Sequence, residues 1–259
     1  MDLGIKGRSA IVCASSRGLG RGCATALAEA GCEVVVNGRN REATEATAAR
    51  IAAATGVRIT PVIADVSTPA GQRALLAACP APDILVNNNA GPPYRDFREL
   101  DRAAMIEGVV QNMVTPIELI KAVIDGMAER GFGRIVNITS LSVMMPLAGL
   151  DLSSRARAGL TAFLGGVART VAGHNVTINN LLPGKMDTDR LRGGMRRTAE
   201  ASGRTFESVA DAQKQEIPAG RFGNAEEFGN ACAFLCSAHA GYITGQNLLI
   251  DGGLFPGAF

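Results

Sequence analysis

A glycine pair in a predicted turn is the first feature of the sequence that could perform chemistry. The apolar segment SAIVCA, at 9–14, predicts a strand, and it leads through SSRGLG into an alanine-rich helix. Gly18 and Gly20 therefore lie at a strand-to-helix turn, where backbone N–H groups at the helix N-terminus can bind a phosphate group. The same pair also occurs in ordinary tight turns, so the cofactor interpretation depends on the residues around it.

Two arginines near this turn indicate which dinucleotide would fit. The second predicted strand, 33–38, ends just before Arg39. At this point a dinucleotide-binding unit carries either an acid for the ribose hydroxyls or a cation for a 2′-phosphate. No acidic residue stands there, and Arg17 supplies a second guanidinium, a group that binds phosphate with two parallel hydrogen bonds. The pattern favours NADP(H) over NAD(H); two surface arginines without a ligand are the alternative.

Short β-branched runs alternate with alanine-rich stretches along the chain, which is the pattern of βαβ units in a parallel sheet. We predict an α/β fold, a Rossmann-type doubly wound seven-stranded parallel sheet with helices on both faces. Its strands are expected at 9–14, 33–38, 58–64, 83–88, 133–139, 176–182 and 247–251. Helical periodicity is clearest over 19–30, 41–55 and 225–237.

The whole chain, 1–259, is expected to form one dinucleotide-binding domain, because α/β folds of this length often do and no stretch has the composition of a linker. Gly31, Gly56 and Gly131 stand where helix C-termini need a residue that tolerates a positive φ. The segment 190–217, rich in Arg, Ser and Gly, breaks the alternation. We expect it to form a lid over the ligand site.

Composition excludes several classes of function. Lys and Arg number 26 against 24 Asp and Glu, and the cations are scattered, so nucleic acid is not an expected partner. The N-terminus shows no signal sequence and no apolar run reaches the roughly 18 residues of a membrane helix, so a cytoplasmic protein is expected, with no membrane partner. The six cysteines lack metal-ligand spacing and are expected in the core, so no metal site is predicted.

The motifs, taken in order, resemble those of the short-chain dehydrogenase/reductase family over residues 5–253. CASSRGLG resembles the family's TGxxxGxG turn, with Cys13 and Ala14 in place of the threonine and the first glycine. The pair that begins at Asp65 resembles the adenine-contacting pair, and NNNAG resembles the NNAG block in either of two registers. PGKMDT resembles the segment that holds the nicotinamide carboxamide, and GRFGNAEEFGNACAFLCS with YITGQNLLIDGG matches the family's C-terminal stretch.

The resemblance implies a set of cofactor-binding residues. With the two arginines discussed above, the set is Ser15, Ser16, Arg17, Gly18, Leu19, Gly20, Arg39, Asp65, Val66, Asn88, Ala90, Gly91, Arg157, Pro183, Gly184 and Thr188. Glycine is used where backbone must approach a ligand closely. The extra methyl group of Ala14 is therefore expected to crowd the pyrophosphate or to shift the turn.

The same resemblance implies an unusual catalytic site. The family uses an asparagine, a serine, a tyrosine thirteen residues after that serine and a lysine four residues further on. Asn112 and Ser140 match the first two, but Ser153 stands at the tyrosine position and Arg157 at the lysine position. A phenol of pKa about 10, lowered by a nearby cation, can give a proton near neutral pH, whereas a serine hydroxyl cannot.

Other residues would have to replace the missing acid. Arg157 keeps a positive charge and can bond a ribose or polarise a hydroxyl, but it cannot cycle a proton. Tyr94, in the loop after the fourth predicted strand, lies at the carboxyl edge of the sheet and is the better substitute acid of the two tyrosines. Ser153 also leaves a gap about one ring wide for substrate, water or another side chain. His174 and His239 form no triad and are expected to be structural.

Three functions are consistent with these residues. The leading one is an NADP(H)-dependent carbonyl reductase or alcohol dehydrogenase for a small-molecule substrate, in which Ser140 holds the substrate oxygen, Arg157 orients the ribose and Tyr94 or a water supplies the proton. The second is a non-redox lyase, hydratase or dehalogenase-like enzyme on the same scaffold. The third is a catalytically silent NADP(H)-binding protein. The C-terminal stretch resembles that of members that assemble through it, which implies a homodimer or homotetramer.

Overall fold

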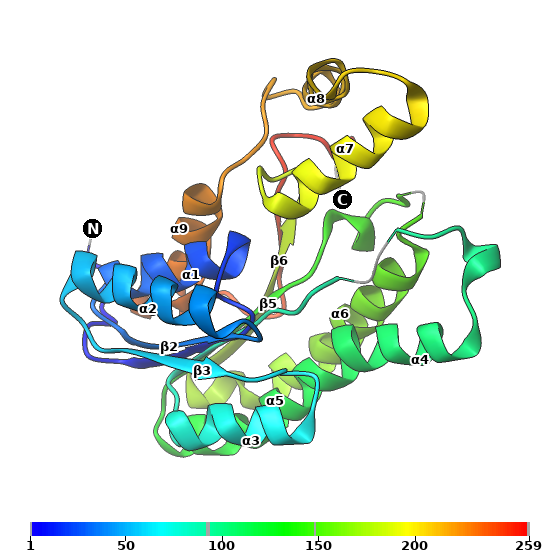
Figure 1. Cartoon of the computed structure of the whole chain (residues 1–259). Coiled ribbons are helices and arrows are strands. Elements are labelled where there is room, and N and C mark those ends of the chain that lie inside the picture. Colours follow the sequence, from blue (N-terminus) through cyan, green and yellow to red (C-terminus); the bar gives the residue numbers. More distant parts are fainter. Residues whose placement is uncertain (1, 92–93, 148, 258–259) are drawn as a thin grey trace.

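The computed structural model describes residues 2–91, 94–147 and 149–257. Their strands form a seven-stranded parallel sheet in the order β3-β2-β1-β4-β5-β6-β7 (Figure 1). The order reverses between β1 and β4, and open α/β sheets bind ligands in the crevice at such a reversal. The bounds are β1 (Ser9–Val12), β2 (Glu33–Gly38), β3 (Ile59–Ile63), β4 (Ile84–Asn87), β5 (Gly133–Ile138), β6 (Val176–Pro183) and β7 (Asn247–Ile250).

Helices cover both faces of this sheet (Figure 1). α1, α2 and α9 pack on one face and α3, α5 and α6 on the other, so the predicted Rossmann-type doubly wound fold is confirmed. None of the helices in the described ranges is long and apolar enough to cross a membrane. The bounds are α1 (Gly18–Glu29), α2 (Arg41–Thr55), α3 (Pro69–Ala78), α4 (Arg102–Val109), α5 (Thr115–Glu129), α6 (Asp151–Val171), α7 (Asp189–Ser202), α8 (Phe206–Gln215) and α9 (Ala225–Cys236).

The central strands form where aliphatic and β-branched residues run together. Every residue of β4 and β5 is buried, as expected of parallel strands covered on both faces. Phe228 of α9 belongs to the apolar cluster on one side of the sheet and Leu119 of α5 to the cluster on the other. Pro61 lies in β3, an edge strand, where the missing backbone N–H does not interrupt the sheet.

The predicted strands and helices are all present, and their bounds differ by one or two residues at some ends. The first strand ends at Val12 rather than at residue 14, because Ala14 turns into the left-handed region with a φ of 43°. Gly56 caps α2 with a φ of 72°, as predicted. The segment 190–217 forms most of α7 and α8, which begin after the capping side chains of Thr188 and Thr205 and share a small apolar cluster of their own.

The cysteines are buried, and we expect them to be unreactive in the native protein. Burial raises the pKa of Cys13 and of Cys32 to about 12, and the thiolate is the reactive form. In a titration with an aromatic disulfide that reacts with free thiols, no cysteine of the native protein should react rapidly. All six should react after denaturation. A native thiol that reacts as fast as free cysteine would contradict this packing.

Among the described residues, no group of three or more His, Cys, Asp or Glu side chains is placed to hold a metal ion.

Candidate functional site

A cleft of about 1590 Å³ follows the carboxyl ends of the strands and is bordered by α7. Three predicted site residues, Ser15, Gly20 and Asn112, are buried and do not line it. The structure brings the others together along its wall: Ser16, Arg17, Gly18, Leu19, Arg39, Asp65, Val66, Asn88, Ala90, Gly91, Tyr94, Ser140, Ser153, Arg157, Pro183, Gly184 and Thr188.

The N-terminus of α1 lies at this cleft and fits a phosphate group. α1 begins at Gly18, whose φ of 58° is in the left-handed region that favours glycine. Arg17 precedes it in an extended conformation and makes no side-chain cap, and the first turn holds no acidic residue. The first N–H groups of a helix lack intrahelical partners and carry partial positive charge. These groups are therefore suited to the pyrophosphate of a dinucleotide.

Ser15 and Gly20 shape the turn from beneath. The Ser15 hydroxyl donates to the carbonyl of Val12 (2.6 Å) and accepts from the N–H of Asn37 (2.9 Å), so its fully buried side chain does not reach the cleft. A Cβ on Gly20 would stand 2.5 Å from the carbonyl oxygen of Ala14. Gly20 is thus required by close packing inside the turn, and the Ser15 side chain supports the turn from within.

Ala14 holds a backbone conformation that suits glycine. Its φ of 43° lies in the region that costs an L-residue about 1–2 kcal/mol. Two asparagines hold it there: the N–H of Ala14 donates to Oδ1 of Asn37 (3.0 Å), and Nδ2 of Asn88 donates to the carbonyl of Ala14 (3.1 Å). Ala14 therefore strains the turn, and it lines the cleft.

Replacing Ala14 with glycine should stabilise the protein. Ala14→Gly is expected to raise the free energy of unfolding by about 1 kcal/mol, because relief of the left-handed strain exceeds the entropy cost of a glycine. Ala53→Gly is the control: Ala53 is exposed inside α2, so this change should lower the free energy of unfolding by about 0.5–1 kcal/mol. Denaturant unfolding measures both, and equal losses at the two positions would exclude strain at Ala14.

The cleft continues to an arginine beyond β2. Gly38 ends that strand, and a Cβ there would stand 2.4 Å from Oγ1 of Thr44. Arg39 follows, with its side chain 69% exposed and its Nη1 3.6 Å from Oδ2 of Asp65. Such an exposed ion pair contributes little to stability. The Arg39 side chain can therefore leave Asp65 and bind a 2′-phosphate at a small cost in free energy.

Ser140 lies where β5 leaves the sheet. Its Oγ accepts a hydrogen bond from the N–H of Ser142 (3.1 Å), which caps a short 3-10 helix, Leu141–Val143. Within the described residues no acceptor takes the Ser140 hydroxyl proton, and the side chain lines the cleft. Ser140 can thus donate to an oxygen atom of a bound molecule.

Ser153 and Arg157 face the same part of the cleft from α6. Both are buried, and Nε of Arg157 donates to Oγ of Ser153 (3.1 Å) while Nη1 donates to the carbonyl of Ile138 (2.5 Å). Burial, with a further contribution from the charge of Arg190, lowers the pKa of Arg157 to about 10. At neutral pH Arg157 is a buried cation bonded to two uncharged oxygen atoms.

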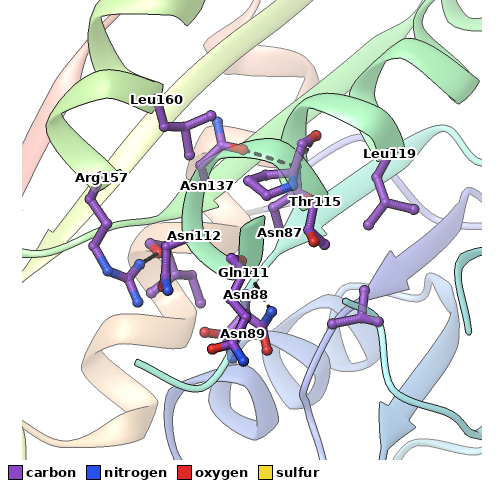
Figure 2. Close-up of a pocket in the computed structure, with 13 residues that line it drawn as sticks. Asn87, Asn88, Asn89, Gln111, Asn112, Thr115, Leu119, Asn137, Arg157 and Leu160 are labelled. Atoms are coloured by element: carbon purple, nitrogen blue, oxygen red, sulfur yellow. Dashed lines mark hydrogen bonds between the residues drawn. The ribbon is translucent and has the colours of Figure 1, made fainter. Parts of the chain in front are cut away.

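A small cavity of about 20 Å³, enough for one water molecule, shares Arg157 and Val66 with the cleft. Figure 2 shows Arg157 and Asn112 at the same side of it. Within the described part of the chain, the buried atoms Asn87 Oδ1, Asn112 Oδ1 and Thr115 Oγ1 around this cavity have no hydrogen-bond partner. Asn112 is therefore connected to the cleft through the cavity that it shares with Arg157.

The three asparagines at the end of β4, Asn87 to Asn89, have different hydrogen-bond partners. Nδ2 of Asn87 donates to Oδ1 of Asn137 (2.9 Å) across β4 and β5, and Nδ2 of Asn89 donates to Oγ of Ser67 (2.8 Å). Asn88 alone of these three contacts the Ala14 turn. The proline pair that follows Gly91 lies outside the described residues.

Tyr94 and Arg190 lie at the cleft edge. The Tyr94 side chain is exposed, and the Arg190 guanidinium stands 5.9 Å from its ring centre. Nη1 of Arg190 also donates to the carbonyl of Gly91 (2.7 Å). Sequence reasoning missed Arg190, although it lies in the first turn of a helix that starts just after the predicted Thr188. Its place two residues after Thr188, a predicted cofactor-binding residue, could have identified it.

The doubly wound sheet, the phosphate-binding helix end and the cleft at the strand ends define a Rossmann-type dinucleotide-binding protein. A sequence profile described as Enoyl-(Acyl carrier protein) reductase matches residues 13–255. The chain belongs to the short-chain dehydrogenase/reductase family.

Similar proteins match over almost their whole length. The 3-oxoacyl-(acyl-carrier-protein) reductase of Aquifex aeolicus is 32% identical, over 98% of this chain and 100% of the relative. L-Sorbose reductase from Gluconobacter frateurii, solved with NADPH and L-sorbose, is 27% identical with a TM-score of 0.94, over 99% and 100% of the two chains. An NADPH dependent reductase involved in bacilysin biosynthesis is 29% identical with a TM-score of 0.91, over 97% and 100%.

Proposed function

We propose that this protein is an NADP(H)-dependent oxidoreductase that interconverts a small carbonyl compound and its alcohol. The observation that carries the proposal is the shared cleft, which joins the N-terminus of α1 and Arg39 to Ser140 and Arg157. The cofactor is NADP(H), because similar reductases are described with NADPH. The residue directly after β2 is Arg39, whereas proteins that bind NAD(H) have an acid there for the ribose 2′-hydroxyl.

The side chains at the cleft have distinct tasks in this reaction. NADPH, when bound, supplies a hydride to the carbonyl carbon. Ser140 donates a hydrogen bond to the carbonyl oxygen, and this bond strengthens as negative charge develops there. Arg157 supplies a fixed positive charge beside the reacting groups, and Tyr94 or a water molecule delivers the proton that completes the alcohol.

The catalytic pair is atypical under this proposal. Ser153 and Arg157 occupy the places of the family's tyrosine and lysine, four residues apart on α6, and they bond to each other at 3.1 Å. The guanidinium keeps the positive charge of the lysine. The serine does not replace the acid, because its hydroxyl does not titrate near neutral pH. A proton donor from outside this pair is therefore needed.

Oxidation of NADPH in the presence of a broad panel of aldehydes and ketones tests the function. Substrate-dependent oxidation is expected, and it should fall when NADPH is replaced by NADH. Tight binding of NADPH without oxidation by any member of the panel would instead favour a silent cofactor-binding protein. Full activity of cofactor-stripped protein toward an epoxide, halohydrin or hydroxy acid would favour a non-redox enzyme.

Two further proposals concern the molecule around the site. α7 and α8 act as a lid, because they line the cleft and pack mainly on each other.

We also propose that the protein assembles as a homodimer or homotetramer through exposed apolar side chains, among them Met105 and Ile106 on α4 and Phe163 on α6. Light scattering of the purified protein measures the assembly, and a monomer at micromolar concentration would exclude it.

A further inference from the structure

We infer that the substrate carries a carboxylate close to its reacting carbonyl group and that Arg157 binds this carboxylate. The inference rests on the proposed reductase function and names its substrate class: short-chain 2-oxo or 3-oxo acids and the corresponding hydroxy acids.

The first observation is that Arg157 is a buried cation without a carboxylate partner. It is 8% exposed, and its two hydrogen bonds go to the neutral oxygens of Ser153 and Ile138. Within the described residues no Asp or Glu forms an ion pair with it. A buried charge is costly unless it is paired. An anionic group brought by a ligand would supply the missing partner.

The second observation is the hydrogen-bonding capacity of this guanidinium. An arginine has five N–H groups, and the bonds to Ser153 and Ile138 use two of them, which leaves three. The planar fork of arginine matches a carboxylate with two parallel bonds. Arg157 also lines the cleft, so these groups are within reach of a bound molecule.

The surroundings of Arg157 favour an anion rather than a neutral group. The positive charge of Arg190, on α7 at the same cleft, acts on Arg157 and makes its protonated form less favourable. A carboxylate placed near both would be attracted by both. Ser153, whose Oγ accepts from Nε of Arg157, lines the same cleft.

The fold brings Ser140 and Arg157 near each other. Nη1 of Arg157 donates to the carbonyl of Ile138 (2.5 Å), two residues before Ser140, so an acid held by both side chains has its carboxylate close to its carbonyl carbon. Leu147 and Leu150 line the cleft as well, so a short alkyl chain on the acid has apolar side chains to contact.

Matched pairs of acids and esters test the inference with NADPH as the reductant. We expect 2-oxobutanoate and acetoacetate to be reduced with a kcat/KM at least about 30-fold above those of their methyl esters, because only the acids pair with the buried cation. In Arg157→Gln kcat should fall for acids and esters alike, because the fixed charge beside the reacting groups is lost. The preference for the acids should also disappear, because their KM rises and that of the esters does not. Arg190→Gln should raise the same KM by a smaller factor. Arg196→Gln is the control, because Arg196 is exposed on α7 and does not line the cleft.

A binding measurement separates recognition from folding and turnover. Oxamate, an unreactive acid of this class, should raise the melting temperature of the NADPH complex of the wild type and of Arg196→Gln, but not of Arg157→Gln. NADPH titration and circular dichroism show whether each variant is folded and binds cofactor. An Arg157→Lys variant, which keeps the charge, should recover part of the oxamate effect.

The possible results distinguish the binding of a carboxylate by Arg157 from the reductase function. Equal use of acids and esters, or an equal loss for both in Arg157→Gln, would overturn the carboxylate assignment while leaving the reductase function intact. A weaker NADPH affinity in Arg190→Gln with unchanged acid preference would assign that cation to the cofactor and remove it from the substrate site. If none of the four compounds oxidises NADPH and oxamate does not bind, the carboxylate assignment fails, and the broad panel of aldehydes and ketones then decides whether the reductase function fails too.

Discussion

Replacing Arg39 with aspartate is expected to raise the dissociation constant of NADPH by about 10²-fold and to lower that of NADH. The change removes a guanidinium placed to bond the 2′-phosphate and puts a like charge opposite it. It also creates an acid just after β2, where dinucleotide-binding proteins bond the ribose hydroxyls of NAD(H). The exposed partner Asp65 is close enough to add to the repulsion.

Titration of cofactor-stripped protein, followed by nicotinamide fluorescence, measures both affinities. Arg41→Asp is the matched control, because Arg41 is exposed on α2, pairs with Glu45 and does not line the cleft. It should change neither dissociation constant. An unchanged NADPH affinity in Arg39→Asp would show that the phosphate does not bind at this end of the cleft, and Arg17→Ala would then identify the other candidate cation.

Ser140→Ala is expected to lower kcat/KM by about 10²–10³-fold with little change in the dissociation constant of NADPH. The hydroxyl is the donor placed at the carbonyl oxygen, and loss of one such donor to a developing negative charge has effects of this size. The same hydroxyl accepts from Ser142 N–H, so the variant is also expected to lose about 1 kcal/mol of stability.

Steady-state kinetics of Ser140→Ala and of a second serine variant, Ser142→Ala, test the expected loss of kcat/KM. Ser142→Ala changes a serine of the same loop whose side chain does not line the cleft. It should keep kcat/KM within a few-fold of the wild type. If Ser140→Ala also keeps its activity, the substrate oxygen is held elsewhere in the cleft.

Much of the fold follows from local sequence pattern. β-branched runs such as EVVVNG are expected as buried strands because both faces of a parallel sheet are covered, and the structure has β2 at the predicted residues. The end of the first strand was predicted two residues too late, because the left-handed turn at Ala14 depends on Asn37 and Asn88. Neither bond is visible in the local sequence.

The site was predictable where a motif fixes the position of a residue in the fold. Gly18, Arg39 and Ser140 each follow or begin a predicted element, and each lines the cleft. The role of Ser15 depends on a contact between segments distant in sequence, since this residue of the turn after β1 bonds to Asn37 of β2. Arg190 reaches the cleft only because α7 folds back over the strand ends, and single-sequence patterns do not specify that path (Figure 1).

The most direct test of the central claim is hydride transfer itself. NADPH carrying two deuterium atoms at its reactive carbon, so that either face delivers a label, is incubated with the protein and with the carbonyl compound that gives the highest rate, and the isolated alcohol is examined by mass spectrometry. We expect one deuterium in the alcohol for each NADPH consumed, and almost none with Ser140→Ala over the same time. Tight NADPH binding with no labelled alcohol from any acid, ester, aldehyde or ketone would contradict it.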